Sequence, residues 1–212
     1  MALASPLSSR LRSVQQRIEA TGRDPAGITI VAVTKGRPVT DCREALELGL
    51  ALGENRVQEA LPKLEAIAGA EWHLIGHLQT NKVRQAAGRF ALIQSIDSER
   101  LGEELARRAP AQPVLLQVNI SREAAKQGAA PESAVSLARA LDRLLDLRGV
   151  MGIGPLGRDP EPAFAELAGL RDDCQQALGR PLPILSMGMS DDFEVALRQG
   201  STMLRLGRVL FG

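Results

Sequence analysis

Ile28-Thr29-Ile30-Val31-Ala32-Val33-Thr34-Lys35 is the stretch that decides the fold: a short run, β-branched at most positions, that ends on a lysine. A continuous apolar run of this length is typical of a strand buried on both faces, as in a parallel sheet. A lysine is unusual there, because an ammonium group is costly to bury without a partner or a use. Desolvation favours the neutral amine, which can form a Schiff base with an aldehyde. Lys35 is therefore the first candidate functional residue.

Lysine is scarce in this chain. Of its 26 basic residues only four are lysines, at positions 35, 63, 82 and 126, so 22 are arginines. Lys35 is the lysine that directly ends a strand-like run. Lys126 lies in a loop after a later strand and is the rival nucleophile.

Strand-like and helix-like segments alternate outward from this run. Apolar runs predict eight strands, at 28–34, 50–53, 72–76, 91–95, 114–119, 148–151, 184–186 and 203–206. Helical patterns are found at 6–21, 39–49, 55–68, 80–87, 98–108, 131–146, 161–178 and 191–199. Such alternation predicts βαβ units and a parallel sheet. Eight units in 212 residues match a compact (β/α)8 barrel of the TIM type, with a doubly wound open sheet as the competing arrangement.

One α/β barrel domain over residues 1–212, with an extra N-terminal helix, is the predicted organisation. No Pro/Ser-rich linker and no recurring repeat divides the sequence. No helix is expected after the last strand, because the chain stops at Phe211-Gly212, and the leading helix could cover that gap. The N-terminal segment contains Arg and Ser and in this respect resembles a transit peptide. However, Leu7, Leu11, Val14 and Ile18 fall at helical spacing and favour an ordinary amphipathic helix.

Composition excludes several classes of protein. The chain is 44% apolar but only 2% aromatic, without tyrosine, so the core must be aliphatic. A net charge of +1 gives no overall attraction to nucleic acid or to an anionic membrane. No stretch approaches the roughly 18–20 apolar residues of a membrane span. Cys42 and Cys174 are far apart in sequence and fit reduced core thiols, which indicates a cytoplasmic protein.

Polar residues follow several predicted strands, at the barrel end where active sites lie. Lys35 follows the first strand and Asn55 the second. Arg205 ends the last strand, where it serves either as a salt-bridge partner or as a partner for an aromatic nitrogen of a cofactor.

The loop 186–190 is small, contains glycine and opens a helix. Backbone N–H groups at a helix start, after the seventh strand of such a barrel, suit phosphate. The alternative is simple helix capping, with Ser190 as the cap and Asp191 and Asp192 in the first turn.

The two histidines, His73 and His77, do not predict a metal site. On a strand, four residues span about 13 Å, which is too far for one metal ion. His73 is instead expected to be a hydrogen-bonded barrel residue. Residues 152–157 match the pattern GxGxxG, but Pro155 inside the pattern and a delayed helix argue against a dinucleotide site.

Lys35, the loop 186–190 and Arg205 together suggest pyridoxal 5′-phosphate (PLP). The sequence also resembles the pyridoxal phosphate homeostasis proteins, single-domain relatives of the alanine racemase barrel. The matching stretches span almost the whole chain: Val31–Lys35, Gly53–Glu59, Trp72–Lys82, Leu185–Asp192, Gly200–Gly207 and Phe211–Gly212.

The resemblance implies a role for each site residue. Lys35 would hold PLP as a Schiff base, residues 186–190 with the backbone of 207–208 would hold its phosphate, Arg205 would face the pyridine nitrogen, and Asn55 would lie beside the ring. The expected cofactor-binding residues are Lys35, Asn55, His73, Met151, Ser186, Met187, Gly188, Met189, Ser190, Arg205, Gly207 and Arg208.

A carrier of PLP is favoured over an enzyme. Racemisation needs a base on each face of the substrate, and the racemases resembled here use a tyrosine that this chain lacks. Arg205 beside the ring nitrogen would also weaken the electron sink of the cofactor. We expect a monomer that buffers PLP and delivers it to apo PLP-dependent enzymes. The alternatives are a slow racemase using Lys35 with water or His73, and an aldolase-like enzyme whose lysine binds substrate directly, with Lys126 as rival nucleophile.

Overall fold

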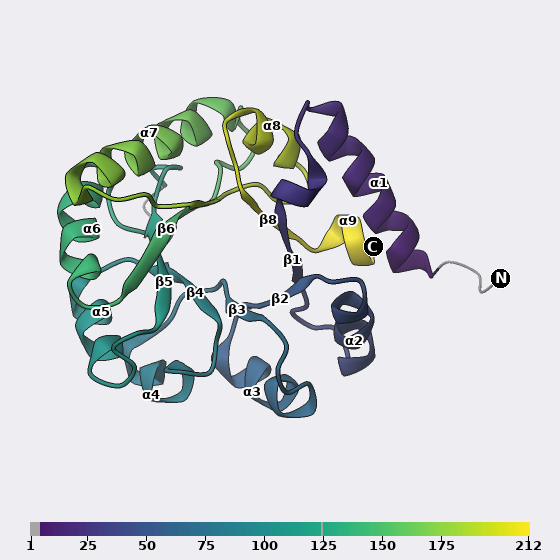
Figure 1. Cartoon of the computed structure of the whole chain (residues 1–212), viewed down its shortest axis with the longest axis horizontal. Helices are drawn as coiled ribbons and strands as arrows, with labels where there is room; N and C mark the ends of the chain where they lie inside the picture. The colour runs from purple at the N-terminus through teal and green to yellow at the C-terminus, as the bar shows by residue number, and fades with distance from the viewer. Residues whose placement is uncertain (1–4, 124) are drawn as a thin grey trace.

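The computed structural model describes residues 5–123 and 125–212, so the predicted domain 1–212 includes residues outside the described ones. Eight parallel strands form a closed barrel (Figure 1). They are β1 Thr29–Val33, β2 Ala51–Glu54, β3 Trp72–Leu74, β4 Leu92–Ile96, β5 Pro113–Val118, β6 Asp146–Gly152, β7 Ile184–Ser186 and β8 Met203–Leu206. Because β8 pairs with β1, the (β/α)8 prediction is confirmed and the open sheet is excluded.

Helices surround the barrel (Figure 1). They are α1 Pro6–Ala20, α2 Val39–Glu47, α3 Val57–Ala66, α4 Val83–Ala86, α5 Glu99–Ala106, α6 Ala134–Asp142, α7 Glu161–Leu178, α8 Phe193–Arg198 and α9 Arg208–Phe211, with 3-10 turns η1 Pro25–Gly27, η2 Thr80–Lys82 and η3 Pro131–Ser133. The expectation of no helix after the last strand is wrong, because the single turn α9 follows β8. The extra N-terminal helix is confirmed as α1.

Helix α1 covers the part of the barrel that α9 is too short to cover. Its apolar stripe, Leu7, Leu11, Val14 and Ile18, is buried. The helix packs against α9 and α8, and Figure 1 shows it alongside α9. The first and last helices of the described residues therefore lie together on one side of the barrel.

One predicted boundary moved because helical and strand patterns overlap. The segment 131–146 continues a helical pattern of leucines, yet α6 ends at Asp142 and β6 already starts at Asp146. Leu147 then pairs with Val114 of β5, so it is fixed in the sheet rather than in a helix. Tertiary pairing decides between the two patterns here, because periodicity alone does not.

Two apolar clusters hold the barrel. The larger lies between the strands and the helices and includes both cysteines, which are free and buried; burial raises the pKa of the Cys174 thiol to about 11. The smaller fills the barrel interior and consists of Val31, Ala51, Leu92, Leu115, Met151 and Met203. Polar side chains are buried there too, which is unusual for a core of this kind.

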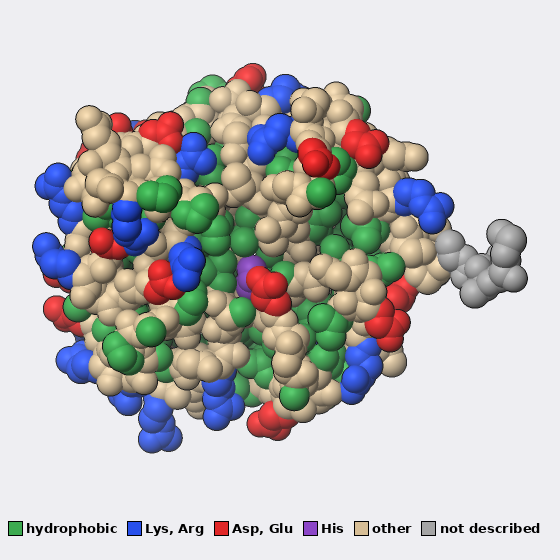
Figure 2. All heavy atoms as spheres, in the orientation of Figure 1, with side chains coloured by type: hydrophobic (Ala, Val, Ile, Leu, Met, Phe, Trp, Pro, Cys, Tyr) green, Lys and Arg blue, Asp and Glu red, His purple; other side chains and the backbone are tan. Residues whose placement is uncertain are grey.

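The surface carries charges of both signs. Figure 2 shows acidic and basic side chains interspersed over one face, around a central hollow with apolar walls where a histidine lies beside an acidic side chain. Within residues 5–123 and 125–212, no helix combines the length and the apolar character that crossing a bilayer requires.

Candidate functional site

A cavity of about 400 Å³ opens at the carboxyl ends of the strands. Its wall includes Lys35 after β1, Asn55 after β2, Met189 after β7 and Arg205 of β8. Cavities of roughly 300–1,000 Å³ are typical of small-molecule and cofactor sites. The fold thus brings four of the expected cofactor-binding residues together although they are up to 170 positions apart in sequence, from 35 to 205.

Lys35 projects into this cavity as an exposed side chain. The backbone turns directly after it, because Gly36 has a φ of 70° and the N–H of Arg37 donates to the carbonyl of Thr34. The expectation that Lys35 is desolvated is wrong for this structure. Its Nζ has no hydrogen bond or ion pair with any described residue, so no protein group blocks the amine from a ligand in the cavity.

A buried ion pair underlies Lys35. Lys63 Nζ of α3 lies 2.7 Å from Glu54 Oε1 and donates to the carbonyl of Thr34, also at 2.7 Å. The Thr34 hydroxyl donates to the same Glu54 oxygen at 2.6 Å. These three side chains join the carboxyl ends of β1 and β2, directly before Lys35 and Asn55. The pairing of Lys63 with Glu54 was not predicted from the sequence, although a glutamate that ends an otherwise apolar strand is a usable signal.

Arg205 is buried and forms hydrogen bonds within the barrel. Its Nη1 donates to Ser186 Oγ at 2.6 Å and its Nη2 to the carbonyl of Gly152 at 2.8 Å. Desolvation lowers the pKa of Arg205 to about 10, and the nearby Asp192 carboxylate partly opposes this. No carboxylate of the described residues forms an ion pair with it, so the salt-bridge interpretation is wrong.

The expectation that Ser190 caps the helix after β7 is wrong, because α8 begins at Phe193 with Asp192 as its N-cap residue and without a side-chain capping hydrogen bond. Asp192 Oδ1 accepts the N–H of Met189 at 2.6 Å, and Ser190 Oγ accepts the N–H of Val209 at 3.2 Å. Burial raises the pKa of Asp192, while its hydrogen bond from Met189 and the charge of Arg205 oppose that shift.

Free donors remain beside this loop. The backbone N–H groups of Ser190, Gly207 and Arg208 have no acceptor within residues 5–123 and 125–212. The carboxylate of Asp191 is turned toward the Arg208 side chain, with which it forms an ion pair at the surface. None of these three residues lines the cavity that contains Lys35, although Met189 and Arg205, close to them in sequence, do.

Four other expected site residues lie away from the cavity. Ser186 is occupied by Arg205 and Gln94 inside the barrel. Met151 is part of the apolar barrel interior, and Met187 packs in the outer core. Gly188 has a φ of 96°, and a Cβ there would lie 2.8 Å from the Cβ of Ala196, so it allows the loop to approach α8. Their roles are structural support in this geometry.

His73 lies at the opposite end of the barrel. It lines a second cavity, of about 520 Å³, together with residues from the amino ends of the strands. As expected from the sequence it is a hydrogen-bonded barrel residue, with Gln94 and Glu71 as partners at 3.0 Å each. It does not line the cavity that contains Lys35, so it cannot contact a ligand held there.

Several cavity residues were not among the expected cofactor-binding residues. Gln117, Asn119, Ile75, Gly76, His77 and Ile153 also line the wall. Gly76 is needed because a Cβ at this position would lie 2.1 Å from the carbonyl oxygen of Asn55. An inward glutamine in an apolar strand, such as Gln117, is the signal that could have found part of this set.

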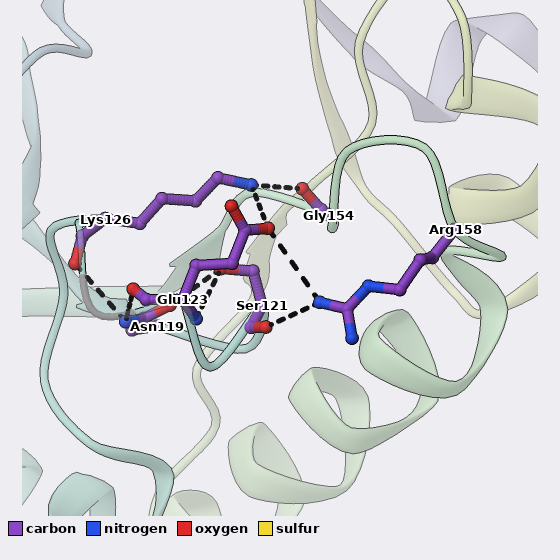
Figure 3. Close-up of polar contacts among 6 residues, drawn as sticks. All are labelled: Asn119, Ser121, Glu123, Lys126, Gly154 and Arg158. Atoms are coloured by element: carbon purple, nitrogen blue, oxygen red, sulfur yellow. Dashed lines mark hydrogen bonds and ion pairs between the residues drawn. The ribbon is translucent and has the colours of Figure 1, made fainter.

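The rival nucleophile Lys126 also lines the cavity but is engaged (Figure 3). Its Nζ forms an ion pair with Glu123 at 2.8 Å and donates to the carbonyl of Gly154 at 3.2 Å. Asn119 Nδ2 donates to the carbonyls of Glu123 and Lys126 and so holds their loop together (Figure 3). Of the two cavity lysines, Lys35 is the one whose amine is without a partner among the described residues.

Comparisons with known proteins agree with this geometry. The family model for the N-terminal domain of alanine racemase matches residues 7–212. The pyridoxal phosphate homeostasis protein of Aquifex aeolicus is 41% identical over 97% of this chain and 96% of its own length. Its namesake from Pseudomonas aeruginosa is 40% identical over 99% of this chain and 95% of its own length.

Solved structures of other proteins are also similar to this chain. PipY of Synechococcus elongatus, solved with PLP bound, is 35% identical, with a TM-score of 0.84 over 97% of this chain and all of its own. Alanine racemase of Corynebacterium glutamicum, at 14% identity and a TM-score of 0.77, shares the fold over 98% of this chain and 60% of its own.

Proposed function

Because this chain belongs to the alanine racemase N-terminal domain family, and within it to the pyridoxal phosphate homeostasis proteins, we propose that it binds PLP, buffers it and delivers it to other proteins. The proposal includes a cytoplasmic location, a single PLP-binding domain and a monomer. It also includes apo PLP-dependent enzymes as acceptors.

The residues of the carboxyl-end cavity fit PLP. The cavity volume of about 400 Å³ suits a ligand of this size. Of the cavity residues, Lys35 without a partner and the buried Arg205 guanidinium match an aldehyde and a ring nitrogen. The free backbone N–H groups of Ser190, Gly207 and Arg208, in the loops that follow β7 and β8, match a phosphate. The observation that supports the proposal most is that Lys35 and Arg205 line one cavity.

When bound, PLP supplies an aldehyde that bonds covalently and reversibly to an amine. In this proposal Lys35 supplies that amine. Ser190, Gly207 and Arg208 bind the phosphate through backbone N–H groups, and Arg205 donates a hydrogen bond to the ring nitrogen. Asn55 and Ile153 lie on the cavity wall and limit how the ring is placed.

Arg205 argues for a carrier over an efficient enzyme. A guanidinium is always a donor, so it faces an unprotonated ring nitrogen and leaves the cofactor a weak electron sink. No tyrosine exists in the chain to act as a second base. The open cavity also leaves Lys35 exposed, so an acceptor protein can reach it.

The absorption spectrum tests this proposal. Purified protein mixed with PLP is expected to show a visible Schiff-base band, which Lys35→Ala abolishes and the matched variant Lys126→Ala retains. Borohydride reduction followed by peptide mapping is expected to find the label on Lys35. A wild-type protein without the band would refute PLP binding, and a label on Lys126 would refute the assignment of Lys35.

Isotope exchange separates the carrier from the enzyme. A carrier is expected to incorporate no more solvent deuterium at Cα of alanine or serine than free PLP does. It is also expected to activate an apo PLP-dependent enzyme faster than an equal concentration of free PLP. Exchange well above free PLP, lost in Lys35→Ala, would instead identify a slow racemase.

A further inference from the structure

A continuous chain of buried polar side chains crosses the barrel from one end to the other. It runs from Arg205 of β8 through Ser186 of β7 and Gln94 of β4 to His73 of β3, and it ends at Glu71. The four links measure 2.6, 2.7, 3.0 and 3.0 Å in that order. The first four residues are almost fully buried, whereas the Glu71 side chain is 62% exposed.

Arg205 determines the direction of every link. A guanidinium can only donate, so Ser186 Oγ accepts from it and must send its own hydrogen elsewhere. That hydrogen goes to Gln94 Oε1. The amide nitrogen of Gln94 then donates to His73 Nδ1 and to the sulfur of Met203, at 3.2 Å.

The chain ends in a defined state of the imidazole. Because Nδ1 of His73 is an acceptor, its one proton sits on Nε2 and is donated to Glu71 Oε1. This hydrogen bond lowers the pKa of Glu71, against the opposing effect of burial. In this arrangement Ser186 Oγ, the Gln94 amide nitrogen and His73 Nε2 each donate to an acceptor.

Adding a second proton to His73 would break this arrangement. An Nδ1–H would face the amide N–H₂ of Gln94, so the amide would have to rotate. Its nitrogen would then donate to Ser186 Oγ, which already accepts from Arg205. Either the Ser186 hydrogen or an N–H of Arg205 would lose its partner in the barrel interior, and a buried polar group without a partner is costly.

We propose that Gln94, Ser186 and His73 are positioning residues that hold Arg205 in its donor orientation, and that they couple the charge of the His73–Glu71 pair at the amino-end cavity to cofactor binding at the carboxyl-end cavity. The coupling is reciprocal, because it is a free energy shared by two sites. The cofactor half of this inference rests on the proposed function, whereas the chain itself does not.

The amino-end cavity determines which groups can act on His73. Its charged wall residues are Glu71 and Arg148, and Arg148 also pairs with Asp146 at 2.7 Å. Thr29 and Thr202 are its other polar wall residues. From inside the barrel, Gln94 is the polar group that contacts the ring. Within residues 5–123 and 125–212, the amino-end cavity is therefore the route by which a proton or a ligand reaches His73.

Histidine NMR tests the chain without cofactor. The protein has two histidines, so ¹⁵N-histidine labelling gives a simple spectrum in which His77, at the other end of the barrel, is the internal control. We expect neutral His73 to carry its proton on Nε2. Ser186→Ala frees the Gln94 amide to rotate, so a second population of neutral His73, protonated on Nδ1, should appear.

A matched variant separates coupling from simple damage. Gln112→Leu removes another buried glutamine, which bonds Gly88 and Phe90 outside the chain. It should lower stability as a buried polar deletion does, but leave His73 unchanged. A His73 tautomer unchanged in Ser186→Ala, or neutral His73 protonated on Nδ1 in the wild type, would overturn the proposal.

The PLP-loaded protein tests the second half. His73→Asn keeps an acceptor near the Nδ1 position but cannot titrate. In wild type, PLP affinity should fall about tenfold more than in His73→Asn as pH is lowered across the range where an imidazole titrates. Gln94→Leu should weaken PLP binding and shift the visible band at unchanged folding. Equal pH profiles in wild type and His73→Asn would refute the coupling, whereas absence of the band in wild type would refute the proposed function instead.

Discussion

Lys63→Met would test whether the ion pair beneath Lys35 holds the carboxyl ends of β1 and β2. The Glu54 side chain is fully buried, and the Lys63 side chain is 12% exposed. With Lys63 removed, Glu54 keeps only the hydrogen bond from Thr34, and its Oε2 already has no partner among the described residues. A carboxylate left in that state should cost about 3 kcal/mol of unfolding free energy, since breaking one side of a buried pair typically costs 3–5 kcal/mol.

Thermal and urea unfolding of the apo protein at neutral pH would measure this loss. A chain of 212 residues should lose roughly 6–12 °C in Tm for about 3 kcal/mol. The same-helix control is Arg56→Met, which removes an exposed pair with Glu59 at 3.0 Å and should cost less than about 0.5 kcal/mol. Adding Glu54→Gln to Lys63→Met should restore at least half of the loss, because no buried charge remains. A loss below about 1 kcal/mol for Lys63→Met, or no recovery in the double variant, would refute the reasoning.

Three further results are expected. Gly76→Ala should destabilise the protein by about 1–3 kcal/mol and weaken PLP binding, because its Cβ would lie 2.1 Å from the carbonyl oxygen of Asn55. The control Gly169→Ala lies in open space on α7 and should stabilise the protein by roughly 0.5–1 kcal/mol. Equal changes of the unfolding free energy in the two variants, measured by urea unfolding, would contradict this. Burial raises the pKa of Cys174 to about 11, so the thiol should resist Ellman's reagent at pH 8 until the protein unfolds, and fast labelling of the native protein would contradict this. Since the folded-state pKa is the higher one, the contribution of the buried thiol to stability is complete below the unfolded pKa of about 8.5 and is lost as the pH rises toward 11. Leu156→Ser, at a side chain 85% exposed, should change the unfolding free energy by less than about 0.5 kcal/mol, and a larger loss would show that Leu156 is packed in solution.

The barrel could be predicted because its strands are short, apolar and separated by helical patterns. A run such as 28–34 is buried on both faces in a parallel barrel, and that requirement is visible in a single sequence. Boundaries were less predictable where one leucine pattern suits both a helix and a strand, as between Asp142 and Asp146. There the pairing of β6 with β5 decides.

The residues of the candidate site likewise fall into those that could be predicted from the sequence and those that could not. Lys35, Asn55 and Arg205 could be placed at the cavity because they follow strands, and strand ends meet at one mouth of a barrel. His73 could not, since a three-residue strand does not reveal which end of the barrel an inward side chain serves. Gln94 was missed for a related reason: its partners come from strands far away in the sequence.

The sequence by itself determined the barrel and the family and predicted Lys35 as the reactive lysine, because local patterning and strand-end position are properties of short segments. Only the tertiary structure decided that Lys35 is exposed, that Ser186 accepts a hydrogen bond from Arg205, and that the polar interior has one direction from Arg205 to Glu71. These depend on which buried donor meets which acceptor across the closed barrel. That matching is set when β8 pairs with β1, so no stretch of sequence contains it.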